Sequence, residues 1–172
     1  GFSGLDAEII ADIRRRLAAI ASGERVTIPL AIESGSRAWG FPSPDSDYDC
    51  RFIYLRGIDD ALKLFPLRDL IETPLTPVLD VNGWDLRKTI KLLLKGNAVV
   101  AEWLRSPLAY QVVEPFREDL LALAGTVARR DAIASHYLHL LYSMRDRVFG
   151  AAVGVAVKKI FYVLRPAMAL RW

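Results

Sequence analysis

The sequence lacks the features of a secreted or membrane-spanning protein. It has one cysteine, Cys50, in 172 residues, so no disulfide can form within the chain. Its longest weakly polar run, residues 149–157, is about half as long as a membrane-spanning helix must be. The N-terminal segment GFSGLDAEII has no basic stretch leading into an apolar core, so no signal peptide is predicted. We therefore expect a cytoplasmic protein with no membrane partner.

The composition allows a full hydrophobic core, and the charge is unevenly distributed along the chain. Hydrophobic residues make up 52% of the sequence. Residues 1–85 contain nine Lys and Arg against 14 Asp and Glu, a net charge of −5, whereas residues 86–172 contain 14 against six, a net charge of +8. The basic half could face a polyanion such as a magnesium-bound nucleotide, although helical surfaces are often rich in Lys and Arg without a partner.

Hydrophobic periodicity predicts an α+β fold, with a short mixed sheet and flanking helices followed by a helical module. The predicted elements are a helix from Leu5 to Gly23, a buried strand over 26–34, a strand over 47–56, a short strand near 70–72, an apolar run at 78–81 with a turn at Asn82-Gly83, a helix over 86–95 and only helices from Ala98 onward. Pro29, inside the first strand, indicates an edge position or a bulge. We expect one domain over 1–105 and a helical domain over 106–172. Because the last helix has no stop signal before Trp172, the helical domain looks truncated at its C-terminus.

Three aspartates, Asp45, Asp47 and Asp49, alternate in the segment PDSDYDCRF. Side chains alternate between the faces of a strand, so Asp47, Asp49 and Arg51 are expected on one face. A calcium-binding loop is excluded, because its sixth position would be a cysteine instead of glycine and its twelfth an arginine instead of glutamate. Asp45 is ordinary for a proline-rich turn. Asp47 and Asp49 are therefore the candidates for a metal site.

A third carboxylate is needed if two strand carboxylates are to bridge two divalent ions roughly 3.5 to 4 Å apart. Asp80 is the candidate, because a charged side chain within the apolar run VLDV needs a compensating partner. Asp85 is the alternative, although a role as helix N-cap already explains it. Gly35 and Ser36 follow the first strand, where a glycine lets a phosphate approach the backbone while the hydroxyl and N–H groups donate to it. Arg37 adds positive charge beside them.

Several motifs of the sequence resemble those of a known superfamily. GSRAWGFPSPDSDYD followed by LDV resembles the signature of the DNA polymerase beta-like nucleotidyltransferases. ESGSRAWGFPSPDSDYDCRFIY, GWDLRKTIKLLLKGN, EWLRSP and KKIFYVLRPAMALRW are similar to the RlaP-type predicted nucleotidyltransferases, which are proposed to act in RNA repair. The resemblance covers most of residues 25–172. It implies a nucleotidyltransferase palm with a short mixed sheet.

The resemblance also implies residue roles. Gly35 and Ser36 would hold the nucleoside triphosphate, Asp47 and Asp49 would bind two Mg²⁺ ions, which Mn²⁺ could replace, and Asp80 would be the third ligand and help to activate the acceptor hydroxyl. The reaction would be an in-line attack by that hydroxyl on the α-phosphorus, with pyrophosphate leaving.

Two further sets of residues have an open role. Lys158 and Arg165 share one face of the last predicted helix and could contact a triphosphate or a nucleic-acid backbone, or could form an ordinary solvated face. Trp39, Trp84 and Trp103 could stack on a base or belong to the core.

The predicted activity is Mg²⁺-dependent transfer of a nucleoside monophosphate from a nucleoside triphosphate, such as ATP, to an RNA hydroxyl. Two alternatives stay open: an enzyme of the same fold that modifies a protein or a small molecule, and a catalytically silent nucleotide-binding or regulatory protein. The intact Asp47, Asp49 and Asp80 favour a catalyst, and the basic second half favours a nucleic acid as acceptor. No feature of the sequence identifies the nucleotide or the oligomeric state.

Overall fold

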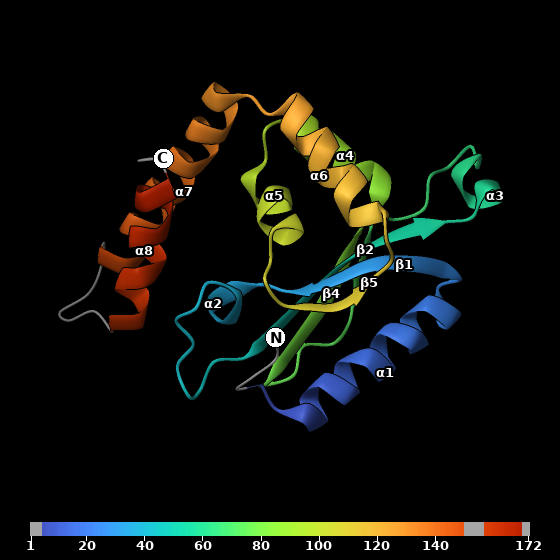
Figure 1. The fold of residues 1–172 in the computed structure, drawn as a ribbon, viewed down its shortest axis with the longest axis horizontal. Coiled ribbons are helices and arrows are strands. Elements are labelled where there is room, and N and C mark those ends of the chain that lie inside the picture. Colours follow the sequence, from blue (N-terminus) through green and yellow to red (C-terminus); the bar gives the residue numbers. More distant parts are fainter. Residues whose placement is uncertain (1–4, 150–156, 170–172) are drawn as a thin grey trace.

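A five-stranded mixed sheet lies at the centre of the molecule, with helices on both faces (Figure 1). A computed structural model describes residues 5–149 and 157–169. The strands are β1 (Val26–Glu33), β2 (Tyr48–Arg56), β3 (Leu70–Glu72), β4 (Leu79–Asp85) and β5 (Ala109–Val112). The helices are α1 (Ala7–Gly23), α2 (Gly35–Ala38), α3 (Ile58–Ala61), α4 (Leu86–Leu94), α5 (Ala98–Leu104), α6 (Phe116–Val127), α7 (Arg130–Phe149) and α8 (Val157–Ala169). The predicted α+β fold is confirmed.

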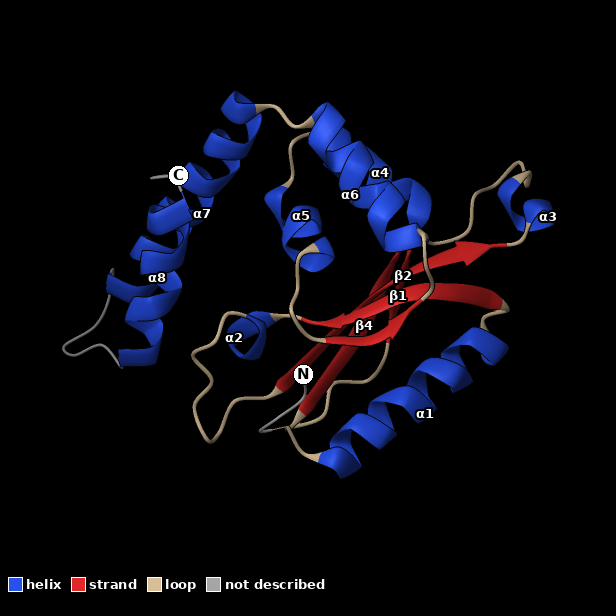
Figure 2. Ribbon diagram, viewed as in Figure 1, coloured by secondary structure: helices blue, strands red, loops and turns tan. Residues whose placement is uncertain are grey.

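The strands lie in the order β3-β4-β2-β1-β5. Strands β2 and β4 are parallel, and the other neighbours are antiparallel. Figure 2 shows α1 on one side of the sheet and α4, α5 and α6 on the other. Helices α7 and α8 lie side by side, away from α1 (Figure 1).

The strict alternation of β2 divides the core between the two faces of the sheet. Tyr48, Cys50, Phe52 and Tyr54 are buried in the cluster under α1, as the alternation predicts. Ile53 belongs to the second cluster, under α4, α5 and α6. Each face therefore has its own apolar core, and β2 contributes to both.

One detail of the strands confirms the sequence-based prediction, and another corrects it. Pro29 lies at a bulge, as predicted, but β1 is an inner strand between β2 and β5 and not an edge. The predicted turn at Asn82-Gly83 is wrong, because both residues lie inside β4. A Cβ on Gly83 would lie 2.3 Å from the ring of Phe52, so this glycine serves close packing of strand against ring.

The region after Ala98 is not entirely helical, because β5 pairs with β1 and extends the sheet. The four-residue segment AYQV is too short to be distinguished by periodicity from the helices around it. The division into domains at residue 105 stays a prediction, and the sheet continues beyond it. Within residues 5–149 and 157–169, no helix combines the length and hydropathy needed to cross a membrane.

Candidate active site

Two of the predicted carboxylates lie opposite each other on neighbouring strands. The parallel register of β2 and β4 pairs Asp49 with Asp80, and it pairs Tyr54 with Asp85 at the other end of the strands. The side chains of Asp49 and Asp80 are 22% and 25% exposed, so solvent can reach both. Asp85 instead accepts a hydrogen bond from the backbone N–H of Arg87 at 2.7 Å and caps α4. The register thus brings Asp80, and not Asp85, to Asp49.

Arg51 lies between these two carboxylates. Its Nη2 is 2.9 Å from Asp49 Oδ1 and 2.7 Å from Asp80 Oδ2, while its Nη1 donates to the carbonyl oxygens of Cys50 and Asp80. Asn82 Nδ2 donates to Asp80 Oδ1 at 3.2 Å. One guanidinium therefore offsets the repulsion between two adjacent negative charges.

Gly35 and Ser36 form the start of α2, next to Asp49. Gly35 has φ +63°, and a Cβ at this position would lie 2.1 Å from Asp49 Oδ2, so only glycine leaves room for the carboxylate. The backbone N–H of Ser34 donates to the carbonyl oxygen of Asp49 at 2.8 Å. Ser36 is buried, and its Oγ is hydrogen-bonded to Ser46 Oγ at 3.1 Å. The chain thus places the Gly-Ser turn directly against one carboxylate of the pair.

Arg37 holds the loop that precedes β2. Its Nε donates to the carbonyl oxygen of Asp47 at 3.0 Å, its Nη2 donates to that of Ser46, and its guanidinium lies 3.9 Å from the centre of the Tyr48 ring. These contacts assign Arg37 a structural role, and its predicted contact with phosphate stays a prediction.

Asp47, the third predicted metal ligand, is not part of a strand, unlike Asp49 and Asp80. It lies one residue before β2 and is exposed, while Asp45 lies in an exposed turn, as predicted.

Among the described residues, no group of three or more His, Cys, Asp or Glu side chains is arranged to hold a metal ion. Asp49 and Asp80 nevertheless fit a hard divalent cation, because both supply oxygen ligands and both are partly exposed to solvent.

A buried carboxyl group, Glu33, lies at the end of β1 and supports this arrangement. Its Oε1 accepts the backbone N–H of Asp49 at 3.1 Å, and its Oε2 accepts the hydroxyl of Tyr110 at 2.6 Å. Burial raises the pKa of Glu33 from 4.5 to about 7, although these two hydrogen bonds oppose the shift. Burial also raises the pKa of the Cys50 thiol, which is fully buried, so Cys50 is a core residue and not a reactive thiol.

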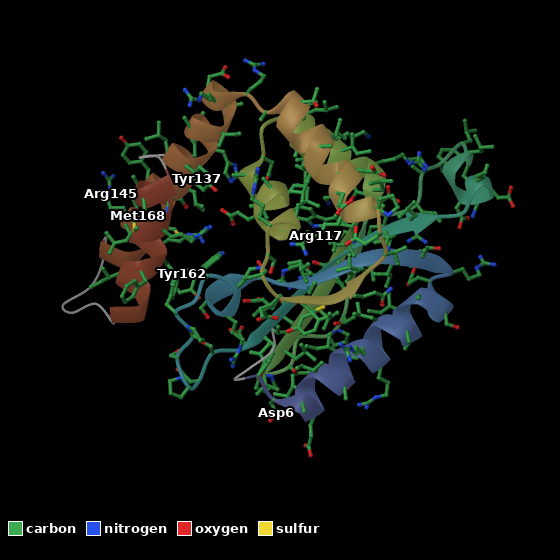
Figure 3. All side chains as sticks on the ribbon, viewed as in Figure 1. Asp6, Arg117, Tyr137, Arg145, Tyr162 and Met168 are labelled. Carbon is green, nitrogen blue, oxygen red and sulfur yellow. The ribbon has the colours of Figure 1, made fainter. Side chains whose placement is uncertain are left out.

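Arg165, a predicted phosphate-binding residue, lies at the contact between α8 and the loop after α2, and its predicted contact with phosphate stays a prediction. Its guanidinium is 3.7 Å from the centre of the Trp39 ring and is paired with Glu102 of α5. Tyr137, on α7, donates to the same Glu102 oxygen at 2.8 Å (Figure 3). Burial and the charge of Glu102 raise the pKa of Tyr137 to about 12. Lys158, the other predicted basic residue, lies in α8, but its side chain is outside the part of the structure that is described.

The candidate stacking tryptophans have different environments. Trp84 and Trp103 stack on each other with ring centres 4.1 Å apart, and Trp103 is buried in the core. Trp39 is half-buried and contacts Phe41 and Tyr162. Trp39 also lines a cavity between α8, α5 and the loop after α2, so it is the candidate of the three for stacking on a base.

Sequence reasoning did not identify Arg51, Glu33, Glu102 or Tyr137 as site residues. A signal existed for Arg51, because strand alternation places it on the face of Asp49. Glu33 had a weaker signal, as a carboxylate at the end of the apolar strand TIPLAIE. Glu102 and Tyr137 had none, because their role depends on how α5 and α7 pack.

Comparison with known proteins identifies the family. The model of RlaP, the RNA repair pathway DNA polymerase beta family, matches residues 9–172. The chain is 43% identical over 148 residues to the uncharacterized protein YcgL of Bacillus subtilis (strain 168). These aligned residues are 86% of this chain and 56% of YcgL. The chain therefore spans about half the length of this relative. With its mixed palm-like sheet and Gly-Ser turn, the chain belongs to the RlaP family of DNA polymerase beta-like nucleotidyltransferases.

Proposed function

We propose that this chain transfers a nucleoside monophosphate from a nucleoside triphosphate to a hydroxyl group of RNA, in the cytoplasm. The observation that carries the proposal is the pairing of Asp49 with Asp80 on β2 and β4, directly beside Gly35. Carboxylate pairs of this kind hold the divalent cations of phosphoryl-transfer enzymes. The family description, an RNA repair pathway, favours RNA as the acceptor.

In the proposed site, Asp49 and Asp80 would hold two Mg²⁺ ions together with Asp47. When bound, one ion would lower the pKa of the acceptor hydroxyl and the other would neutralise charge on the triphosphate. Gly35 and Ser36 lie along the phosphates, with Arg37 keeping the loop of Asp47 in place. The acceptor oxygen forms a bond to the α-phosphorus, the bond from that phosphorus to the bridging oxygen breaks, and pyrophosphate leaves. Asp80 takes up the proton of the hydroxyl.

A transfer assay with matched variants tests this proposal. The protein is incubated with each α-labelled nucleoside triphosphate and Mg²⁺, with total RNA, with protein or with no acceptor, and the labelled product is identified. Mutation of a residue that only orients a metal ligand lowers activity about 10–100-fold. Asp49 and Asp80 are proposed as ligands themselves, so Asp49→Asn and Asp80→Asn should each lower transfer at least about 100-fold. Asp85→Asn is the matched control, because asparagine also caps helices and Asp85 lies at the other end of β4.

The assay also separates the alternatives. Label on RNA that depends on Asp49, Asp80 and Mg²⁺ supports the proposal. Label on protein indicates the same reaction with a different acceptor, and wild-type transfer by Asp49→Asn contradicts the carboxylate assignment. A protein that binds no Mg²⁺-nucleotide in calorimetry would be a silent member of the family.

A further inference from the structure

A cavity of about 600 Å³ lies between α8, α5 and the loop that follows α2. Its walls come from segments far apart in the sequence, including Trp39, Glu102 and Met168. Sites for small molecules have volumes of roughly 300 to 1,000 Å³ and combine an apolar lining with a few polar groups. The cavity therefore has the size of a site for a nucleoside or a molecule of similar bulk.

One wall of the cavity is an exposed apolar stripe on α8. Phe161, Leu164 and Met168 follow i, i+3, i+7 spacing and so share a face of the helix, and they are 45%, 46% and 64% exposed. All three line the cavity, with Phe41 opposite, whose ring stacks on that of Phe161 at 5.4 Å. Apolar side chains on one helix face gain free energy when a flat apolar ligand covers them.

A second wall carries polar groups from α5, α7 and α8. Glu102 joins Tyr137 and Arg165 at the rim, and Arg105 is exposed beside them. Arg165 Nε is buried and has no hydrogen-bond partner in residues 5–149 and 157–169. An apolar wall facing a few hydrogen-bonding groups suits a heteroaromatic ring with polar edges, as in a nucleobase.

Two residues that line the cavity also contact the candidate active site. They are Glu33 and Ser34, and their backbone and side-chain atoms contact Asp49. Gly35, the proposed phosphate position, is the next residue. A nucleotide with its phosphates at Gly35 can therefore extend its base towards α8.

We propose that this cavity binds the base of the nucleoside triphosphate and that it selects purines. The inference rests on the proposed function, because it assumes that the triphosphate lies at Gly35 and Ser36. Two fused rings cover more of the stripe formed by Phe161, Leu164 and Met168 than one ring does, and base stacking on aromatic side chains contributes to affinity.

Calorimetry tests this inference with the Mg²⁺ complexes of ATP, GTP, CTP, UTP and inorganic tripolyphosphate. ATP and GTP should bind at least about tenfold more tightly than the other three ligands. Phe161→Ala should lower the affinity for ATP and GTP to about that for tripolyphosphate. Phe65→Ala is the matched control, because Phe65 is 82% exposed, does not line the cavity, and follows α3, far from α8 in Figure 1.

A second readout guards against a folding defect in Phe161→Ala. Addition of ATP or GTP should change the fluorescence of the wild-type protein, and this change should be much smaller in Trp39→Phe, which keeps an aromatic wall. Equal affinity for all five ligands would overturn the base site while leaving the triphosphate site intact, and tighter binding of CTP or UTP would overturn the purine preference. Failure of all five to bind would overturn the proposed function itself.

Discussion

The two faces of the sheet use the same strand, β2, for different purposes. On the face under α1, Tyr48, Cys50 and Phe52 are all buried along the first half of the strand. On the other face, Ile53 is buried, but the apolar core ends there, and Arg51 and Asp49 are charged and partly exposed. One face of β2 is thus apolar along the whole first half of the strand, whereas the other carries the charged residues of the candidate active site there. We call these the apolar face and the reactive face.

The largest expected effect comes from the apolar face. Phe52→Ala should lower the free energy of unfolding by about 3–5 kcal/mol, because Phe52 is fully buried and its ring packs closely on Gly83. Urea denaturation measures this change. Phe65→Ala, at an exposed position, should change the free energy of unfolding by less than about 0.5 kcal/mol. An equal loss in both variants would contradict the assignment of this face as the stabilising one.

The second effect concerns Glu33, a carboxyl group on the apolar face, where β1 pairs it with Cys50. Its pKa of about 7 in the folded state exceeds the ordinary glutamate value of 4.5. Between these values the unfolded carboxyl is ionised while the folded one keeps its proton, so the free energy of unfolding should fall as the pH rises from about 4.5 to 7, by up to about 3 kcal/mol. Above pH 7 this contribution should be constant.

Glu33→Gln should remove this pH dependence, because glutamine does not titrate. The measurement is urea denaturation of both proteins at several pH values between 4 and 8. We expect Glu33→Gln to gain stability relative to the wild type as the pH rises. Parallel pH profiles of the two proteins would show that Glu33 ionises at its ordinary pKa.

The third prediction tests how closely the reactive face depends on Gly35. Gly35→Ala and Gly40→Ala both place a side chain at positive φ, at +63° and +82°, so each should cost about 1–2 kcal/mol of stability. Only Gly35→Ala displaces a functional group, since its Cβ would lie 2.1 Å from Asp49 Oδ2, whereas nothing lies within 4 Å at Gly40. Nucleotide transfer should therefore fall sharply in Gly35→Ala alone. Equal transfer by the two variants would argue against contact between the turn and the carboxylate.

These contrasts also show what sequence reasoning can reach. Alternation along β2 predicted which side chains are core and which face the site, because a strand has a fixed period of two. The apolar run VLDV marked Asp80 as a charge that needs a partner, and Arg51 is that partner. Gly83 was mistaken for part of a turn, since a glycine that packs against a ring looks the same in sequence as a glycine that bends the chain.

Contacts between residues far apart in the sequence could not be predicted. The pairing of Asp49 with Asp80 depends on the register of two strands whose paired residues are 31 positions apart in the sequence. The cavity depends on α8 packing against the loop after α2. Glu33 and Tyr110 come together across 77 residues. No local period predicts such contacts, so the sequence pointed to the candidate carboxylates but not to the groups that contact them.

The smallest expected effect in stability concerns Arg51, which balances the charge of the reactive face. Arg51→Gln removes a cation that lies within 3 Å of both Asp49 and Asp80, so without metal the variant should lose about 1 kcal/mol through repulsion between the two carboxylates. A more negative site should bind Mg²⁺ more tightly, so Mg²⁺ should raise the Tm of Arg51→Gln more than that of the wild type.

Arg56→Gln is the control for this last prediction, because Arg56 lies on the same strand but pairs with Glu24 at the other end. Thermal denaturation with Mg²⁺ and with a chelator should give Arg56→Gln the same Mg²⁺-dependent rise in Tm as the wild type. An Arg51→Gln protein with that same rise would show that Arg51 does not compete with the ion. A larger rise would mean that Mg²⁺ can replace the Arg51 guanidinium in offsetting the repulsion between Asp49 and Asp80. The reactive face would then depend on a bound charge for its stability, which the apolar face does not.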